Sequence, residues 1–129
     1  MARSTQRKSR SRLTFSEAEW EVLSSTTEDV YGLWEGSGGI RSPSVSIEGP
    51  DVRNAIRSLL GRKLIYLLWF RHDTNEEETI ADSETEELLA DPSVWEPPNS
   101  GDRYVAYAAT PAGERVFRRS KPPVSRAVR

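Results

Sequence analysis

The sequence predicts a small α+β domain of three or four helices and one β-hairpin. Three features lead to this prediction: segments whose apolar residues recur at helical spacing behind recognisable start signals, two apolar runs typical of paired strands, and a long acidic stretch between those runs. A chain of 129 residues suits one domain. Its apolar share of 36% and charged share of 29% are typical of a soluble protein with a modest core.

Composition excludes several kinds of site. The chain has no cysteine, which excludes disulfides and thiolate ligands. It has a single histidine, His72, so most ligands of a zinc ion would have to be carboxylates, which is unusual. We recognise no nucleophile paired with a base and no glycine-rich phosphate loop, so we expect neither enzymatic activity nor a cofactor or metal. The longest apolar run, residues 64–70, is far shorter than the roughly 20 residues that cross a bilayer. We therefore expect no membrane contact, no signal peptide and a cytoplasmic location.

The net charge of −2 conceals an uneven distribution along the chain. Residues 1–12 carry five bases and no acid, residues 114–129 carry six bases and one acid, and the body between them carries seven bases and nineteen acids. We expect residues 1–12 to be a disordered basic arm, because they lack the apolar side chains that would offset the entropy of ordering, and residues 120–129 to be a disordered basic tail. Such ends either bind phosphates or only solubilise the protein.

The first helix is predicted over residues 17–34. Ser16 and Glu19 form a capping box, and Phe15 and Trp20 occupy the two positions of a hydrophobic staple. The glycine-rich stretch that follows ends the helix. The residues that recur at helical spacing and predict one face of about five turns are Trp20, Leu23, Thr27, Val30, Tyr31 and Trp34.

Residues 40–49 allow two interpretations. Their apolar residues could alternate along a short strand, or Ser42 as a cap, Pro43 as the first residue and Gly49 as a stop could frame a short helix. Both remain open at this point.

A second helix is predicted over residues 50–61, ended by Gly61 and followed by the basic turn of Arg62 and Lys63. Its apolar stripe and its polar face follow from helical spacing. The stripe consists of Val52, Ile56, Leu59 and Leu60. The polar face consists of Arg53, Asn54, Arg57 and Ser58.

A buried strand is predicted over residues 64–70, and an acidic insertion over residues 72–102 follows it, with eleven acids, no lysine or arginine and three prolines. Ser83 and Glu86 have the spacing of a capping box, which predicts a short helix, while the rest of the insertion should be mobile. The apolar residues expected to lie on this helix or to pin the loop onto the domain are Leu88, Leu89, Val94 and Trp95.

Residues 103–109 alternate in the manner of a strand that returns beside the first one as a long-looped hairpin. Thr110 as a cap and Pro111 as the first helical residue then predict a last helix through Val116 and Phe117. The predicted order is therefore helix, short element, helix with a basic face, turn, strand, loop, strand and helix.

This order resembles a winged helix-turn-helix domain. Residues 51–65 are similar to a recognition helix that runs into the first wing strand, and residues 107–114 are similar to the second wing strand and the threonine-capped helix of multiple-antibiotic-resistance-type and phenolic-acid-type bacterial regulators. The resemblance covers about residues 13–119 and implies a winged-helix fold in which residues 72–102 are an insertion in the wing. It also implies a non-catalytic DNA-binding protein that regulates transcription.

The resemblance assigns roles to particular residues. A recognition helix places polar side chains in the major groove, where arginine can bind guanine and asparagine can bind adenine. Arg53, Asn54 and Arg57 would read bases, with Ser58 beside them. The residues expected to contact phosphates or to reach along the backbone as an arm are Arg62, Lys63, Arg10 and Arg12. The alternative is that these are ordinary solvating charges on an exposed helix.

The acidic insertion departs from the short and often basic wing tip of the family. Residues 40–49 also depart from it, because the family has its positioning helix there and this chain has a weak element.

The rival function is a protein-interaction module on the same fold, in which the insertion and the aromatic first helix bind a partner. Alternatively, the insertion masks the basic helix face until a partner displaces it, or is a tolerated surface loop. The resemblance also suggests the hypothesis of a homodimer through the first or last helix. The candidate partner-binding residues are Glu86, Leu88, Leu89 and Trp95.

Overall fold

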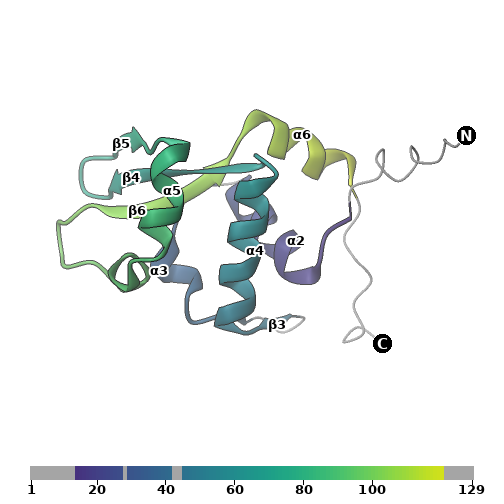
Figure 1. Cartoon of the computed structure of the whole chain (residues 1–129), viewed down its shortest axis with the longest axis horizontal. Helices are drawn as coiled ribbons and strands as arrows, with labels where there is room; N and C mark the ends of the chain where they lie inside the picture. The colour runs from purple at the N-terminus through teal and green to yellow at the C-terminus, as the bar shows by residue number, and fades with distance from the viewer. Residues whose placement is uncertain (1–13, 28, 42–44, 121–129) are drawn as a thin grey trace, which may run out of the picture.

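An antiparallel sheet of four strands forms one layer of the protein, and helices cover one of its faces (Figure 1). The computed structural model describes residues 14–27, 29–41 and 45–120, and the predicted basic ends lie outside them except for Ser120. The strand order is β1-β6-β4-β5, and a separate two-stranded hairpin pairs β2 with β3. These described residues also form five α-helices and one 3₁₀ helix, which confirms the α+β class.

Helices and strands alternate along the chain rather than forming separate regions. The strands are β1 (Tyr31–Gly32), β2 (Ile40–Arg41), β3 (Ser46–Ile47), β4 (Ile65–Arg71), β5 (Glu76–Thr79) and β6 (Tyr104–Ala109). The helices are α2 (Glu17–Thr26), α3 (Leu33–Gly36), α4 (Gly49–Gly61), α5 (Asp82–Leu89), α6 (Pro111–Arg119) and the 3₁₀ helix η1 (Pro92–Trp95).

The two central strands, β4 and β6, have one face toward the helices and one outer face. They pair antiparallel from Ile65 with Ala109 to Phe70 with Tyr104, which confirms the predicted long-looped hairpin. Because side chains alternate along a strand, every second side chain of β4 and β6 lies in the main core and the others lie on the outer face. The core side chains with no exposed surface are Val22, Leu23, Leu33, Val52, Ile56 and Leu59. The outer face carries Leu68, Ala106 and Ala108, bordered by Val30, Tyr66, Phe70 and Tyr104.

The start of α2 is as predicted. The Glu19 backbone N–H donates to Ser16 Oγ at 3.1 Å, and the Ser16 N–H donates to Glu19 Oε1 at 2.8 Å, which completes the capping box. The ring centroids of Phe15 and Trp20 lie 6.3 Å apart, as expected for the staple. Trp20 also packs on Phe117 of α6, with 4.6 Å between ring centroids, so the first and last helices contact each other within the chain.

The prediction of a helix over residues 17–34 is wrong beyond Thr26. The hydroxyls of Thr26 and Thr27 donate to the carbonyls of Leu23 at 2.7 Å and Ser24 at 2.8 Å, and such local bonds compete with a continuing helix. The chain then extends as β1, which pairs with β6, before it turns into the short α3. Sheet pairing with a strand more than 70 residues away therefore replaces the local helical pattern.

Residues 40–48 form neither a single strand nor, where described, a helix, and Gly49, proposed as a helix stop, is instead the first residue of α4. They contain β2 and β3, which pair antiparallel with Ile40 opposite Ile47. The residues proposed as the helix cap and first residue, Ser42 and Pro43, lie outside the described residues. The strand interpretation therefore holds in part, with two short strands in place of one.

The helix predicted over residues 50–61 is confirmed as α4. Its stripe is buried at Val52, Ile56 and Leu59 and half-buried at Leu60. After the helix, Lys63 adopts the left-handed conformation with φ 63°, and the chain turns directly into β4.

The acidic insertion is more regular than its composition predicts. We expected most of residues 72–102 to be a mobile loop, but a tight turn with Asn75 at φ 58° leads into β5, which pairs with β4. The predicted short helix is confirmed as α5 and passes through both predicted leucines. Its N-cap is Ala81 and it begins at Asp82, so the capping box proposed at Ser83 is wrong, because that residue already lies in the first turn.

The last helix, α6, begins as predicted. Thr110 Oγ1 accepts a hydrogen bond from the Gly113 N–H at 3.0 Å and donates one to the Lys63 carbonyl at 2.9 Å. The helix lies so close to the start of β4 that a Cβ atom on Gly113 would lie 2.0 Å from the Leu64 carbonyl oxygen. Only glycine permits this approach of the two backbones.

We predict that Gly113→Ala lowers the free energy of unfolding by about 1–3 kcal/mol, because backbone atoms must move to admit the methyl group. Chemical denaturation checks this. The matched control is Gly61→Ala at the end of α4, where a Cβ atom would meet nothing within 4 Å. The control should leave stability unchanged or raise it by up to about 1 kcal/mol. Equal losses in the two variants would contradict the close approach.

We also predict an alkaline loss of stability that depends on Tyr107, which is 3% exposed. Burial chiefly, and then the charges of Glu35 and Tyr31, raise the pKa of its phenol above the ordinary value. In the unfolded chain the phenol ionises near pH 10, whereas the folded protein retains the proton, so the free energy of unfolding should fall as the pH rises above about 10. Tyr107→Phe should flatten this slope in denaturation curves measured from pH 8 to 11. A flattening of equal size in Tyr66→Phe, on the outer face, would refute the assignment.

Candidate nucleic-acid interface

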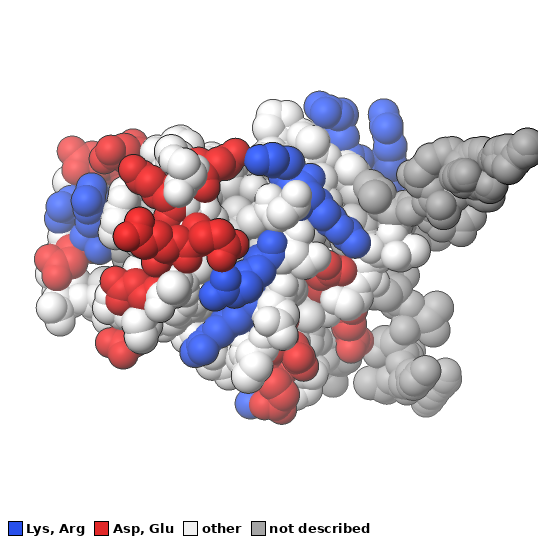
Figure 2. Space-filling view, viewed as in Figure 1, with Lys and Arg blue, Asp and Glu red and all other residues white. Residues whose placement is uncertain are grey.

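A stripe of basic side chains crosses the exposed side of α4, and carboxylates lie on both sides of it, with the larger group over α5 (Figure 2). The apolar stripe of the helix faces the core, so helical spacing leaves Arg53, Asn54 and Arg57 exposed. Asn54 borders a hollow on the side of α2 that Glu17 and Ser58 also line. Arg53 and Arg57 instead contact groups on the side of α5 and η1.

The larger group of carboxylates lies on the segment that contains α5 and η1, residues 82–95, which we call the acidic unit. Each of its five acids is exposed. They are Asp82, Glu84, Glu86, Glu87 and Asp91. Two of the five pair with bases that the sequence assigned to DNA.

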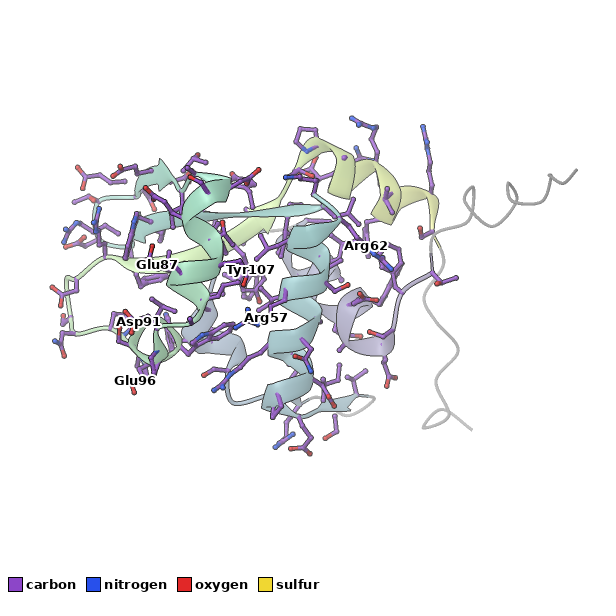
Figure 3. The ribbon with its side chains drawn as sticks, viewed as in Figure 1. Arg57, Arg62, Glu87, Asp91, Glu96 and Tyr107 are labelled. Carbon is purple, nitrogen blue, oxygen red and sulfur yellow. The ribbon has the colours of Figure 1, made fainter. Side chains whose placement is uncertain are left out.

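Arg57 binds the acidic unit through two groups, and it lies between α4 and α5 in Figure 3. Its Nη1 lies 3.5 Å from Glu86 Oε1, and its Nη2 donates to the Leu89 carbonyl at 3.4 Å. The carbonyl belongs to the last turn of α5, where backbone carbonyls have no partner within the helix and the helix dipole favours a cation. The Arg57 side chain nevertheless remains 41% exposed and Glu86 remains 85% exposed.

Arg53 contacts the acidic unit through an aromatic ring rather than a carboxylate. Its guanidinium carbon lies 5.2 Å from the centroid of the Trp95 ring, which is a cation–π distance. Trp95 Nε1 donates to the Leu89 carbonyl at 3.0 Å, and the Trp95 carbonyl accepts from Ser37 Oγ at 2.9 Å. Two hydrogen bonds, one at the indole nitrogen and one at the backbone carbonyl, therefore hold the residue whose ring faces Arg53.

The two bases after α4 diverge. Lys63 Nζ lies 2.9 Å from Asp82 Oδ2 in an exposed ion pair with the acidic unit. Arg62 turns the other way, where it donates to the Thr14 carbonyl at 3.0 Å and lies over the Phe15 ring at 5.1 Å. Arg62 and Lys63 form the predicted turn, but their side chains contact different parts of the protein, and their contacts with phosphate stay a prediction.

Three more residues are expected to bind DNA: Ser58, Arg10 and Arg12. Ser58 is half-buried and donates its hydroxyl to Glu19 Oε2 on α2 at 2.5 Å, so it is used within the fold. Arg10 and Arg12 lie outside the described residues. The structure thus brings Arg53 and Arg57 together, with Asn54 beside them.

The apolar residues proposed for partner binding mostly serve as anchors. Leu89 is 2% exposed and Trp95 is 6% exposed, and both belong to the main core. Leu88 is half-buried against that core. Only Glu86 is largely exposed, so Leu89 and Trp95 hold the acidic unit on the domain instead of facing a partner.

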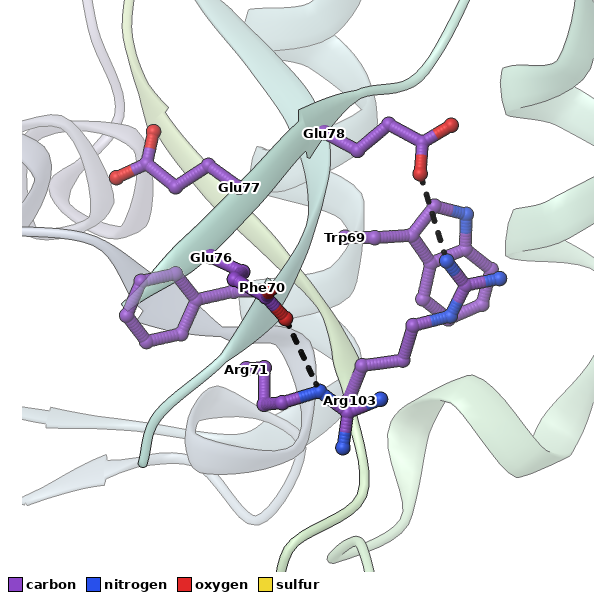
Figure 4. A pocket seen from close by; sticks show the side chains of 7 residues that line it. All are labelled: Trp69, Phe70, Arg71, Glu76, Glu77, Glu78 and Arg103. Atoms are coloured by element: carbon purple, nitrogen blue, oxygen red, sulfur yellow. Dashed lines mark ion pairs between the residues drawn. The ribbon is translucent and has the colours of Figure 1, made fainter. Parts of the chain in front are cut away.

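A second hollow lies at the far end of the sheet (Figure 4). It has a volume of about 450 Å³, and its bases are already paired: Arg103 lies over the Trp69 ring at 4.2 Å and 3.5 Å from Glu78. Arg71 lies 3.5 Å from Glu76 and also donates to the Gly101 carbonyl. Sequence reasoning missed these contacts because pairing between β4, β5 and β6 creates them. Their only signal in the sequence was the row of glutamates at residues 76–78 between Arg71 and Arg103.

Within residues 14–27, 29–41 and 45–120, no three histidine, aspartate or glutamate side chains gather in the way that a metal ion requires. In the same described part of the chain, no helix has the length and apolar character to cross a bilayer. Comparison of the sequence with protein-family models and curated proteins, and of the structure with solved structures, found no match. The assignment of a function therefore depends on the geometry of α4 and the acidic unit.

We predict that Trp95→Ala lowers the free energy of unfolding by about 3–5 kcal/mol, because it empties a buried site. It also removes the hydrogen bond to the Leu89 carbonyl and the ring under Arg53. Glu96→Ala, at the exposed neighbouring position, is the control and should change stability by less than about 0.5 kcal/mol. Chemical denaturation of both variants measures this. A similar, small effect of the two substitutions would show that Trp95 is not an anchor.

Proposed function

We propose that the protein is a non-catalytic, DNA-binding regulatory protein of the winged-helix type, with α4 as its recognition helix. The observation that carries this proposal is the exposed pair Arg53 and Arg57 on a helix that runs directly into β4. The order of α2, α3, α4, β4, β6 and α6, with β4 and β6 paired, agrees with the order of such a domain. Fold alone does not assign function, so the proposal rests on these side chains.

The proposed binding mode uses the groups that α4 exposes. Arg53 and Arg57 would bind guanine edges or phosphates and Asn54 would bind adenine in the major groove. Lys63 would add a phosphate contact at the end of the helix, and the basic residues 1–12 would act as an arm along the backbone. In this role the protein would regulate transcription in the cytoplasm. A homodimer through α2 or α6 also remains a proposal. Because Trp20 of α2 and Phe117 of α6 pack on each other within the chain, such a dimer would have to use other faces of these helices.

One observation favours a second candidate, a protein-interaction module. The acidic unit already binds a basic helix face within the chain, through Glu86 and the Leu89 carbonyl on Arg57. The same chemistry would suit a basic partner protein, and its exposed carboxylates Glu84 and Glu87 would attract one by charge. This candidate becomes the better one if α4 binds no DNA.

We predict that the full chain binds a mixed-sequence DNA duplex with an affinity that falls steeply with salt, because phosphate contacts release counterions. Arg53→Ala/Arg57→Ala should weaken binding about tenfold or more and reduce the salt slope by about one to two, since each lost phosphate contact removes about 0.9 from it. Fluorescence anisotropy across a series of salt concentrations measures both quantities.

The matched control is Arg71→Ala/Arg103→Ala, which removes the same charge at the far end of the sheet. If both double variants lose the same affinity, binding reflects net charge and not α4. A chain that lacks residues 1–12 tests the arm separately: loss of binding on this deletion alone would assign DNA contact to the arm. If neither the full chain nor any variant binds at low salt, the protein-interaction module is the remaining function.

A further inference from the structure

We propose that the acidic unit restrains DNA binding by holding Arg53, Arg57 and Lys63, the bases that α4 and the following turn would otherwise offer to DNA. This inference rests on the proposed function of α4. It assigns a competitive role to two carboxylates of the chain itself. Glu86 pairs with Arg57 and Asp82 pairs with Lys63, and phosphate oxygens would need the same two bases.

The contacts have the chemistry of a competitor for phosphate. A carboxylate and a phosphate oxygen are both anionic acceptors that bind a guanidinium or ammonium group by a charge-assisted hydrogen bond. Glu86 and the Leu89 carbonyl together accept from the two terminal nitrogens of Arg57. Asp82 accepts from Lys63 at 2.9 Å. A phosphate therefore has to compete with an internal acceptor for each of these two bases.

The restraint acts on side chains and leaves the acidic unit in place. The unit is fastened to the domain by Leu89 and Trp95, which are buried in the core, and by the hydrogen bond between Ser37 Oγ and the Trp95 carbonyl. Its carboxylates, in contrast, are exposed: Asp82 is 82% and Glu86 is 85% exposed. Exposed ion pairs are weak and are screened by salt, so a phosphate can displace them one at a time.

General repulsion between the unit and DNA would also lower affinity, so the two effects must be separated. Glu84 and Glu87 provide the means, because they lie on the same helix and are exposed, but they line a hollow with Trp69 and Leu88 and have no ion pair with α4. Figure 3 shows Glu87 on one side of α5 and Arg57 on the other, between α5 and α4. Neutralising either pair of acids changes the net charge by the same amount.

The experiment measures the affinity of the full chain for a mixed-sequence duplex by fluorescence anisotropy at several salt concentrations. It compares the unaltered protein, Asp82→Asn/Glu86→Gln and the control Glu84→Gln/Glu87→Gln. Each double variant removes one acid from the first turn of α5, so the effect on the helix terminus is matched. Circular dichroism and thermal unfolding confirm that all three proteins remain folded.

The expected result is that Asp82→Asn/Glu86→Gln binds about three- to tenfold more tightly than the control at the same salt, as two exposed ion pairs allow. Its salt slope should be steeper than that of the control, because in the control salt also screens the ion pairs that restrain binding. In an Arg57→Ala background, Glu86→Gln should give no gain beyond that of Glu87→Gln, since the base that it frees is absent.

Two outcomes overturn the inference, and they are distinguishable. If the two double variants gain equally while Arg53→Ala/Arg57→Ala loses affinity, α4 binds DNA but the acidic unit acts only through its overall charge. If Asp82→Asn/Glu86→Gln binds no DNA even at low salt, the proposed function fails and the restraint fails with it. A gain from Glu86→Gln that persists without Arg57 also refutes the direct contact.

Discussion

The antiparallel pairing of β4 with β6 is the interaction on which the rest of the structure depends. Six residue pairs, from Ile65–Ala109 to Phe70–Tyr104, join the end of the helical half of the chain to its last strand. Residues 72–103 lie between these strands in the sequence, so they must leave the sheet and return to it. They do so by adding β5 to the free edge of β4 and by placing α5 and η1 beside α4. The position of the acids beside the basic helix thus follows from strand pairing.

Apolar burial and surface charge contribute differently to the contact between α4 and the acidic unit. Leu89 and Trp95 supply the stability, because a buried side chain of their size contributes about 1.5–3 kcal/mol by leaving water. The exposed pairs of Arg57 with Glu86 and of Lys63 with Asp82 contribute at most about 1 kcal/mol each. The geometry is therefore fixed by the core, whereas the charges remain free to change partners. This combination is what a restraint on a charged binding face requires.

Local signals predicted the helix starts well. Ser16 caps α2 and Thr110 caps α6, as the sequence indicates. Each cap is a hydrogen bond between residues three apart in the sequence, so local spacing is enough to predict it. The same reasoning failed between Thr27 and Trp34, where helical spacing was present but pairing with β6 produced β1. It failed again in the insertion, where a row of glutamates was expected to be mobile and instead forms an edge strand. In both places a distant partner decided the conformation.

The sequence by itself determined the α+β class, the extent of α4, and the exposure of Arg53 and Arg57, since period and capping depend on residues within a few positions of one another. Only the tertiary structure decided what those arginines contact. Arg53 lies over Trp95, which is 42 residues away in the sequence, and Arg57 binds Glu86, 29 residues away. No local pattern encodes such pairs, because the two members of each pair are brought together only by the path that residues 72–103 take between β4 and β6. For that reason the sequence suggested both the candidate interface and its masking by the insertion, whereas the particular contacts of the two arginines required the folded chain.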